Sequence, residues 1–374
     1  MAEKTIIFVN ASTVLISGGL ILAKNIIQTL ANANSFELYI TCPRHHLYKS
    51  YEGESLKIIV VPRWMLKRHF RLYFDLFWLP ARIREKKPDI VLSLGNIPAF
   101  THYWQIFLHD NPFLVEDNYQ NIPLPIKKKL IHYIRCKIAL MALRFVNLIL
   151  VQTPYQQYKL MNKTNLKIPS RIVTPGLPQI NLHHNEIKID YKLFCTRKIK
   201  LLCLARYYEH KNIEMLEEVA KIVEAQSLPF VFYLTINRHH GQKAVALIDR
   251  IQRNGLHNTL INLGYLKHNF IRELIEPING IVIPSLLESF SLSCIEAWHF
   301  RKPLFISDLE SMKSACHDAA IYFNPYSPAD MIDKITSTFN NPTSIDSIIE
   351  AGSERLNQLS DWEEYVRIIK EFAL

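Results

Sequence analysis

The sequence predicts an α/β protein built from two doubly wound domains. Its 374 residues are too many for one ordinary hydrophobic core and suit two. Apolar, strand-like runs alternate with helix-like stretches along the chain, which is the pattern of parallel sheets flanked by helices. A polar stretch over residues 181–190 separates two such series. We therefore expect domains over residues 1–182 and 193–359, joined by that stretch.

In the first series, strand-like runs cover residues 5–9, 36–41, 58–61, 90–93, 104–108, 146–151 and 172–174. Gly18 and Gly19 follow the first run and precede a helix over residues 20–31. Glycines at a helix N-terminus let backbone N–H groups approach a phosphate, although a tight turn requires glycine equally. His109 follows the fifth run, where a side chain can face a cleft; a lone histidine is also common as a satisfied polar residue.

In the second series, strand-like runs cover residues 200–204, 230–235, 260–263, 281–283, 304–306 and 321–323. Helices are expected over residues 328–339 and, with amphipathic spacing, over 362–372. Arg206 and Lys211 lie in the loop after the first of these strands. Arg offers a bidentate fork and Lys a point charge, so such a pair at a strand-to-helix corner suits a diphosphate.

Two carboxylates occupy the corner after residues 281–283. Ligands of open α/β sheets bind beyond the carboxyl ends of the strands, which is where Glu288 falls. Glu296 lies eight residues later in a helix-like run. Ser293 and Glu296 also have capping-box spacing, in which Glu296 would satisfy its own helix N-terminus, and this structural interpretation remains equally open.

The run from Pro284, Pro-Ser-x-x-Glu-Ser-Phe-x-Leu-x-x-x-Glu-Ala, resembles the signature of family 4 glycosyltransferases. These are retaining enzymes of the GT-B fold that use nucleotide sugars. The Arg-x4-Lys-Asn run from Arg206 is similar to the family's donor-binding pair in order and spacing. Two positions depart from the family pattern, because members commonly have glycine in place of Ser291 and Lys302.

The resemblance implies two Rossmann-like domains facing each other across a cleft, with a last helix over residues 360–374 returning to the first, acceptor-binding domain. It implies catalytic roles for Glu288 and His109. It implies donor binding by Gly18, Gly19, Arg206, Lys211, Glu296, Ser289, Phe290, Ser291 and Leu292. No Asp-x-Asp triplet occurs, so we expect no metal and no cofactor besides the nucleotide diphosphate sugar that serves as the donor substrate.

The charge of the chain is unevenly distributed. Of 44 Lys and Arg and 34 Asp and Glu, residues 1–180 hold 23 basic and 10 acidic ones, which leaves 21 and 24 for the remainder. Two basic segments with interleaved apolar residues lie in the first half and favour contact with an anionic membrane or acceptor, against the alternative of ordinary solvated helices. The residues concerned are Lys67, Arg68, Arg71, Trp78, Lys127, Lys128 and Lys129.

Neither a signal-peptide pattern nor an apolar run of membrane-spanning length is present, and six scattered cysteines lack zinc-site spacing. We therefore expect a cytoplasmic protein, peripheral on the inner face of the membrane. The function expected is hexosyl transfer to a glycan or lipid-linked acceptor in surface polysaccharide biosynthesis of the lipopolysaccharide, O-antigen or capsule kind.

Three other functions fit parts of the sequence. A catalytically silent membrane-associated subunit remains open because of the two departures from the family pattern. A nucleic-acid binder fits the basic half but lacks a recognition motif. A glycoside hydrolase needs carboxylates on two sides of the scissile bond, which Glu288 and Glu296 on one corner supply poorly.

Overall fold

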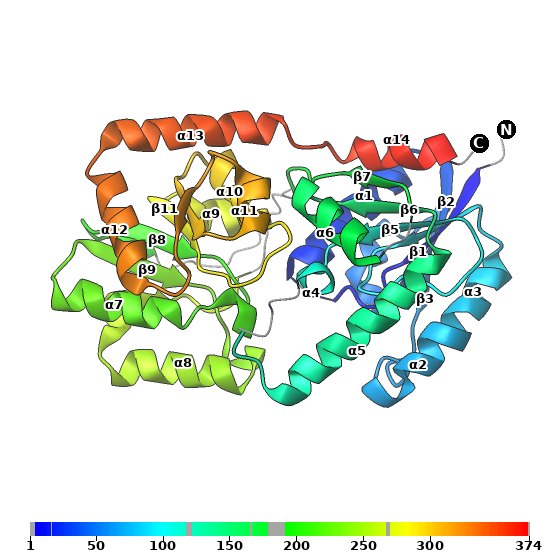
Figure 1. Ribbon diagram of the computed structural model, residues 1–374, viewed down its shortest axis with the longest axis horizontal. Coiled ribbons are helices and arrows are strands. Elements are labelled where there is room, and N and C mark those ends of the chain that lie inside the picture. Colours follow the sequence, from blue (N-terminus) through cyan, green and yellow to red (C-terminus); the bar gives the residue numbers. More distant parts are fainter. Residues whose placement is uncertain are drawn as a thin grey trace. The chain divides into compact units, whose positions relative to one another are not determined.

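The computed structural model describes the chain over residues 4–15, 17–116, 122–164, 167–178, 191–266 and 270–372. It forms two compact units, the first of Met1–Gln120, Pro125–Pro178 and Leu359–Leu374, the second of Asn121–Leu124 and Gln179–Gln358. The linker expected over residues 181–190 lies outside the described residues. Each unit carries one parallel sheet, which confirms the predicted α/β class (Figure 1).

The first unit contains a seven-stranded sheet in the order β3-β2-β1-β4-β5-β6-β7. Its strands are β1 (Thr5–Asn10), β2 (Phe36–Cys42), β3 (Leu56–Val60), β4 (Ile90–Ser93), β5 (Gln105–His109), β6 (Leu148–Val151) and β7 (Ser170–Ile172). The last strand begins two residues before the predicted run. As an edge strand it starts with the partly exposed Ser170 and Arg171, which apolarity alone does not reveal.

Helices cover both faces of this sheet, namely α1 (Ser17–Asn32), α2 (Arg71–Tyr73), α3 (Leu79–Lys86), α4 (Pro112–Val115), α5 (Ile126–Ala142), α6 (Pro154–Thr164) and α14 (Glu363–Phe372). A π-helical turn, Phe74–Trp78, joins α2 to α3. Successive side chains of a strand point to opposite faces. Ile7 and Val9 accordingly pack in the core under α1, whereas Phe8 packs with residues of α3.

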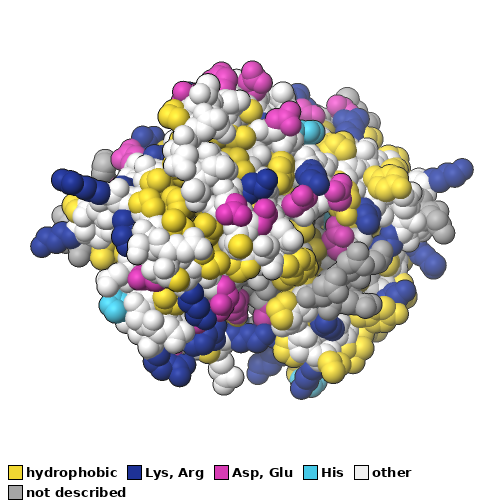
Figure 2. Space-filling view, turned by 60° about the vertical axis from the view of Figure 1, so that its left-hand side comes forward, with side chains coloured by type: hydrophobic (Ala, Val, Ile, Leu, Met, Phe, Trp, Pro, Cys, Tyr) yellow, Lys and Arg dark blue, Asp and Glu magenta, His cyan; other side chains and the backbone are white. Residues whose placement is uncertain are grey.

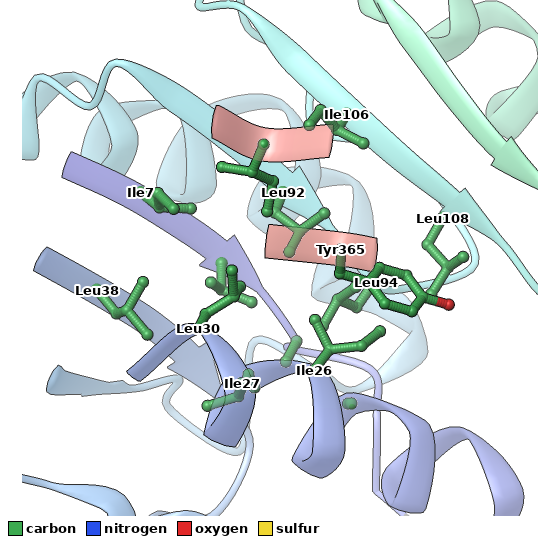
Figure 3. Packing of buried hydrophobic residues seen from close by; sticks show 14 of the residues in the cluster. Ile7, Ile26, Ile27, Leu30, Leu38, Leu92, Leu94, Ile106, Leu108 and Tyr365 are labelled. Atoms are coloured by element: carbon green, nitrogen blue, oxygen red, sulfur yellow. The ribbon is translucent and has the colours of Figure 1, made fainter. Parts of the chain in front are cut away.

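The last helix, α14, packs against the first unit. Tyr365 and Ile369 are at most 1% exposed and share one core cluster with residues of α1, β4 and β5. Figure 3 shows the Tyr365 ring lying between Ile26 of α1 and the side chains of Leu94 and Leu108. The C-terminal segment therefore completes the hydrophobic core of the N-terminal half of the chain.

The second unit contains a six-stranded sheet in the order β10-β9-β8-β11-β12-β13. Its strands are β8 (Ile199–Cys203), β9 (Phe230–Leu234), β10 (Leu260–Asn262), β11 (Gly280–Ile283), β12 (Leu304–Ser307) and β13 (Ile321–Phe323). Its helices are α7 (Met215–Ala225), α8 (Gln242–Arg253), α9 (Ile271–Ile275), α10 (Leu292–His299), α11 (Glu310–Cys316), α12 (Pro328–Phe339) and α13 (Pro342–Asn357).

Helix α10 is held in place by one tryptophan. The indole Nε1 of Trp298 donates a hydrogen bond to the carbonyl oxygen of Ala319 at 2.9 Å. Helix α13 approaches so closely that a Cβ atom on Gly352 would lie 2.6 Å from Cδ1 of Trp298. The missing side chain of Gly352 thus allows α13 to pack directly on α10.

Candidate functional site

Both sheets reverse their strand order at one point. In the second unit the reversal lies between β8 and β11, which pair through Gly280 with Leu201 and Ile281 with Leu202. In the first unit it lies between β1 and β4. Loops diverge from such a point to opposite faces of the sheet and leave a crevice at the carboxyl ends of the strands, where ligands of this fold class bind.

The loops after β8 and β11 bring two predicted residues into direct contact. The ammonium Nζ of Lys211 lies 2.5 Å from Oε1 of Glu288, and the hydroxyl of Ser285 donates to the same oxygen at 2.8 Å. Glu288 is only 7% exposed, and the Lys211 side chain is 22% exposed. The two charges therefore neutralise each other in a largely desolvated place at the point of reversal.

Backbone contacts fix the loop that carries Lys211. The N–H of Leu286 donates to the carbonyl oxygen of His210 at 2.7 Å, which ties this loop to the one after β11. A 3-10 turn, Glu209–Lys211, ends at Asn212, whose left-handed φ of 52° is tolerated by asparagine. The Asn212 side chain donates to the carbonyl oxygen of Pro325 at 2.9 Å. Lys211 is thus presented from a rigid turn.

Arg206 precedes this turn in the same loop and is partly exposed. Its guanidinium lies 5.8 Å from the centroid of the Tyr208 ring, a cation–π distance. Its charge also contributes, after burial, to lowering the pKa of His240. Within the described ranges no carboxylate forms an ion pair with Arg206, so its fork is available to an anion.

The segment from Ser289 to Leu292 leads from the loop into α10. Ser289, Phe290 and Ser291 are each at most 8% exposed, and Leu292 is partly buried. Glu296, 4% exposed, lies in the body of α10. These residues place a buried carboxylate and a run of backbone amides beside the Lys211–Glu288 pair along the chain.

The alternative capping role for Glu296 is wrong. Helix α10 begins at Leu292 with Ser291 as its N-cap residue, so Ser293 is already helical, and Glu296 lies two residues beyond the third helical position that a capping box requires. The hydroxyl of Ser293 instead donates to the carbonyl oxygen of Leu204 at 3.5 Å. Glu296 is therefore a buried carboxylate that is not engaged in a capping box.

Neither of the two departures from the family pattern, Ser291 and Lys302, lies at a residue with a left-handed backbone conformation. Ser291 has φ −91° and ψ 123°, an extended conformation open to any residue. At the other end of α10 it is Arg301, with φ 52°, that adopts the left-handed conformation. The N–H of Lys302 closes the helix end by donating to the carbonyl oxygen of Ala297 at 2.8 Å. Glycine is not required at either position.

In the first unit, Gly18 and Gly19 lie in the first turn of α1, which begins at Ser17 rather than at the predicted residue 20. The N–H groups of a first helical turn have no partner inside the helix. A Cβ atom on Gly19 would lie 3.5 Å from Oδ2 of Asp110, an ordinary contact. The fold itself thus leaves room for a side chain at residue 19.

His109 ends β5 and is completely buried. Neither of its ring nitrogens has a hydrogen-bond partner among the described residues. Burial lowers the pKa of His109 to about 4 because the charged imidazolium loses its hydration. The ring is therefore neutral near pH 7, with one donor and one acceptor in need of partners.

Asp110 precedes Asn111-Pro112, a setting that fits a simple turn and gives no sign in the sequence of a site residue. Its carboxylate instead faces Gly19, and burial raises its pKa to about 6. Asp110 is also a charged neighbour of the hydroxyl of Tyr365, and burial raises the pKa of that phenol. No local signal links residues 110 and 365, since α14 reaches this place only through the fold.

The predicted membrane or acceptor residues fall into two groups. Arg71 and Trp78 serve the fold in part, because Arg71 pairs with the buried Asp75 at 2.6 Å and the Trp78 ring stacks on Phe74. Lys67, Lys127 and Lys128 are exposed, and Lys129 is partly exposed. Arg68 begins a 3-10 turn, Arg68–Phe70, directly after Lys67 in the chain.

In the part of the chain that the structure describes, no group of three or more His, Cys, Asp or Glu side chains is placed to hold a metal ion. All six cysteines are free thiols. No described helix combines the length and the apolar composition that spanning a bilayer requires.

Comparison with known proteins finds one family model and several solved structures that this chain resembles. Residues 186–355 match the family model described as glycosyl transferases group 1. Sucrose-phosphate synthase from Thermosynechococcus elongatus is similar in structure over 98% of both chains, with a TM-score of 0.75 and 15% identity. HepE from Anabaena, solved with UDP and glucose, is similar over 98% of both chains, with a TM-score of 0.73 and 13% identity.

A glycosyltransferase from Rickettsia africae is similar over 99% of this chain and 98% of its own, with a TM-score of 0.71 and 14% identity. A sequence comparison with curated proteins finds no match. At these identities the structural likeness establishes the fold, and the predicted GT-B fold, with its two Rossmann-like units, is confirmed.

Proposed function

We propose that this chain, whose residues 186–355 match the family model of glycosyl transferases group 1, is a retaining glycosyltransferase of family 4. It moves a hexose from a nucleotide diphosphate sugar to a glycan or lipid-linked acceptor. The single observation that carries this proposal is the contact between Lys211 and Glu288 at the point where the second sheet reverses. This contact holds a cation that can bind phosphate, Lys211, in hydrogen-bond contact with a carboxylate that can bind sugar hydroxyls, Glu288.

The pair suggests how a donor is received. A diphosphate offers Lys211 a stronger, doubly charged partner, and Arg206 adds a bidentate fork from the same loop. Once Lys211 turns to the phosphates, Glu288 becomes free to accept hydrogen bonds from hydroxyls of the donor sugar. Binding of the diphosphate and binding of the sugar are thereby coupled. The diphosphate draws Lys211 away from Glu288, and the sugar hydroxyls bind the carboxylate that is freed.

Departure of the diphosphate is the step that needs electrostatic stabilisation. Lys211 and Arg206 supply fixed positive charge, which lets the reaction proceed without a metal ion. The amides of Gly18 and Gly19 at the start of α1 add oriented dipoles. Glu296 holds the ribose hydroxyls. The configuration is retained by attack on the face that the phosphate leaves, with a phosphate oxygen taking the acceptor's proton.

Neutral His109 fits a contact with the donor sugar. An uncharged imidazole both donates and accepts, so it can satisfy a hydroxyl in either sense. Its two ring nitrogens, fully buried and without partners among the described residues, are what such a ligand would satisfy. HepE, whose structures contain UDP-glucose or UDP with glucose, shows that this fold accommodates such donors.

We place the reaction on the cytoplasmic face of the membrane, in synthesis of a surface polysaccharide of the lipopolysaccharide, O-antigen or capsule kind. The uneven charge of the chain supports this location, since residues 1–180 carry the whole basic excess and the remainder is slightly acidic. Figure 2 shows one face of the molecule, on which Lys and Arg side chains and exposed hydrophobic side chains both occur.

The proposal is tested by screening UDP-, GDP- and ADP-sugars for nucleotide release, with membrane extract as the source of acceptor. Glu288→Gln should lower transfer at least about a hundredfold while the circular dichroism spectrum is unchanged. Gly19→Ala should keep the fold, because its Cβ meets only an ordinary contact, yet slow transfer by crowding the donor phosphates. Full activity in Glu288→Gln, or turnover of none of these donors, would refute the assignment.

A further inference from the structure

Helix α5 carries apolar side chains on two opposite faces. Its inward face, Cys136, Ala139 and Ala142, is buried against the first unit. A second apolar stripe points outward at spacings of three and four residues. Its members and their exposed fractions are Ile126 86%, Leu130 55%, Tyr133 50%, Ile134 46% and Met141 60%. An ordinary surface helix carries polar residues there, so this stripe requires an explanation.

The segment from Trp64 to Phe77 exposes a second set of large apolar side chains. Their exposed fractions are Trp64 45%, Phe70 45%, Leu72 55%, Tyr73 49%, Leu76 44% and Phe77 63%. Trp64 contacts Phe70 edge-on at 5.1 Å between centroids, and Tyr73 stacks on Phe77 at 5.8 Å. The rings thus pack on one another at the surface, while Met65 and Phe74 anchor the segment in the core.

These two elements are neighbours in the first unit. Asp75 lies in the π-helical turn of the segment, 4% exposed, and is bound by Arg71. Burial raises the pKa of Asp75, and the charges of Arg71 and of Arg135 on α5 oppose that rise, which places Arg135 nearby. Figure 1 shows α5 running past α2 and α3. The two outward apolar sets, residues 64–77 and 126–141, thus belong to neighbouring elements of one unit, and together they are here termed the docking surface.

The charge around the docking surface has one sign. Asp75, buried and paired, is the only acidic residue in either element, and no Asp or Glu occurs from residue 118 to residue 185. Exposed Lys67 belongs to the first element, and exposed Lys127 and Lys137 of α5 lie beside or within its outward stripe. The ammonium of Lys137 lies 5.4 Å from the centroid of the Tyr133 ring, a geometry in which a long basic side chain extends along an apolar one.

Exposed apolar side chains surrounded by positive charge favour one binding partner of the docking surface over another. A second copy of the chain would bring the same basic residues against themselves across a twofold axis, which repels. An anionic bilayer presents negative headgroups to the lysines and an apolar interior to the rings. Each basic residue near such a surface strengthens binding about fivefold, and exposed aromatic and aliphatic side chains add to this by entering the acyl boundary.

We propose that the docking surface binds the first unit to the face of an anionic lipid bilayer, with the outward stripe of α5 and the ring cluster around Phe77 inserted below the headgroups. This deepens the membrane location proposed above and rests on it. The test requires no transfer reaction, so its outcome is independent of whether the donor site works.

The experiment is cosedimentation of the full-length protein with vesicles of phosphatidylcholine alone or mixed with phosphatidylglycerol, at low and high salt. The wild type should pellet with the anionic vesicles. Phe77→Ser combined with Leu130→Ser should weaken that binding at least about tenfold at either salt concentration. Lys127→Gln with Lys137→Gln should weaken this binding at low salt, and the loss relative to the wild type should be much smaller at high salt.

Tyr158→Ser on α6 is the matched control, because Tyr158 is 65% exposed in the same unit but lies outside the docking surface. It should bind vesicles like the wild type. Absence of binding to anionic vesicles, or equal loss in the control, would overturn the proposal. A dimer in sedimentation velocity that Phe77→Ser with Leu130→Ser dissociates would also overturn it and assign the surface to a second copy.

Discussion

Replacing Lys211 by methionine leaves the carboxylate of Glu288 buried without its counter-charge. At 2.5 Å and an effective dielectric constant of about 20, the attraction between the two charges is about 7 kcal/mol, most of which offsets their desolvation. Breaking a buried pair by removing one partner costs about 3–5 kcal/mol. Because the Lys211 side chain is 22% exposed, we expect the lower end, about 3 kcal/mol of unfolding free energy.

Glu288→Gln should cost less, about 1–2 kcal/mol, because the amide oxygen still accepts hydrogen bonds from Lys211 and Ser285. The double variant, Lys211→Met with Glu288→Gln, should be no less stable than Lys211→Met alone, since glutamine leaves no charge to be buried. The two substitutions are thus expected to be strongly non-additive.

The measurement is urea unfolding of the full-length variants followed by circular dichroism. Lys313→Met provides the control, because Lys313 pairs with Asp308 at 2.7 Å in the same unit but with both side chains about 45% exposed. It should cost less than about 1 kcal/mol. If Lys211→Met costs no more than this control, or if the two site substitutions simply add, the pair is not the desolvated contact described above.

Two further predictions concern single positions. The pKa of His109 is lowered to about 4 in the folded chain and is near 6.5 in the unfolded chain. Between these pH values only the unfolded chain binds a proton at this residue, so the unfolding free energy decreases as the pH falls. About 2 kcal/mol of unfolding free energy should be lost between pH 7.5 and pH 5. Urea titrations of His109→Gln at these two pH values should lack this part of the loss. If the variant loses as much unfolding free energy as the wild type, the burial argument is contradicted. Gly352→Ala should lower the melting temperature of the second unit despite the better helix propensity of alanine, because its Cβ would meet Trp298 at 2.6 Å. Gly53→Ala, with nothing within 4 Å, should leave the melting temperature unchanged, and equal melting temperatures for the two variants would show that α13 shifts freely on α10.

Much of the candidate site was predictable because it lies at strand-to-helix corners. Arg206, Lys211 and Glu288 each follow an apolar run that is recognisable without any tertiary information. The cap of α10 was not predictable, since Ser291 and Ser293 are both good N-cap residues and only the observed start of the helix chooses Ser291. The neutral state of His109 was not predictable either, because it depends on complete burial.

The alternation of strands and helices, the two-sheet α/β class and the basic character of the first half are determined by the sequence alone, because periodicity and charge are local properties of the chain. Only the tertiary structure decided that Lys211 binds Glu288, 77 residues away, since that contact exists because β8 and β11 are neighbours in the sheet. The fold alone likewise brought Tyr365 beside Asp110 and Arg135 of α5 near Asp75. These contacts depend on which elements pack together, and no local pattern encodes that.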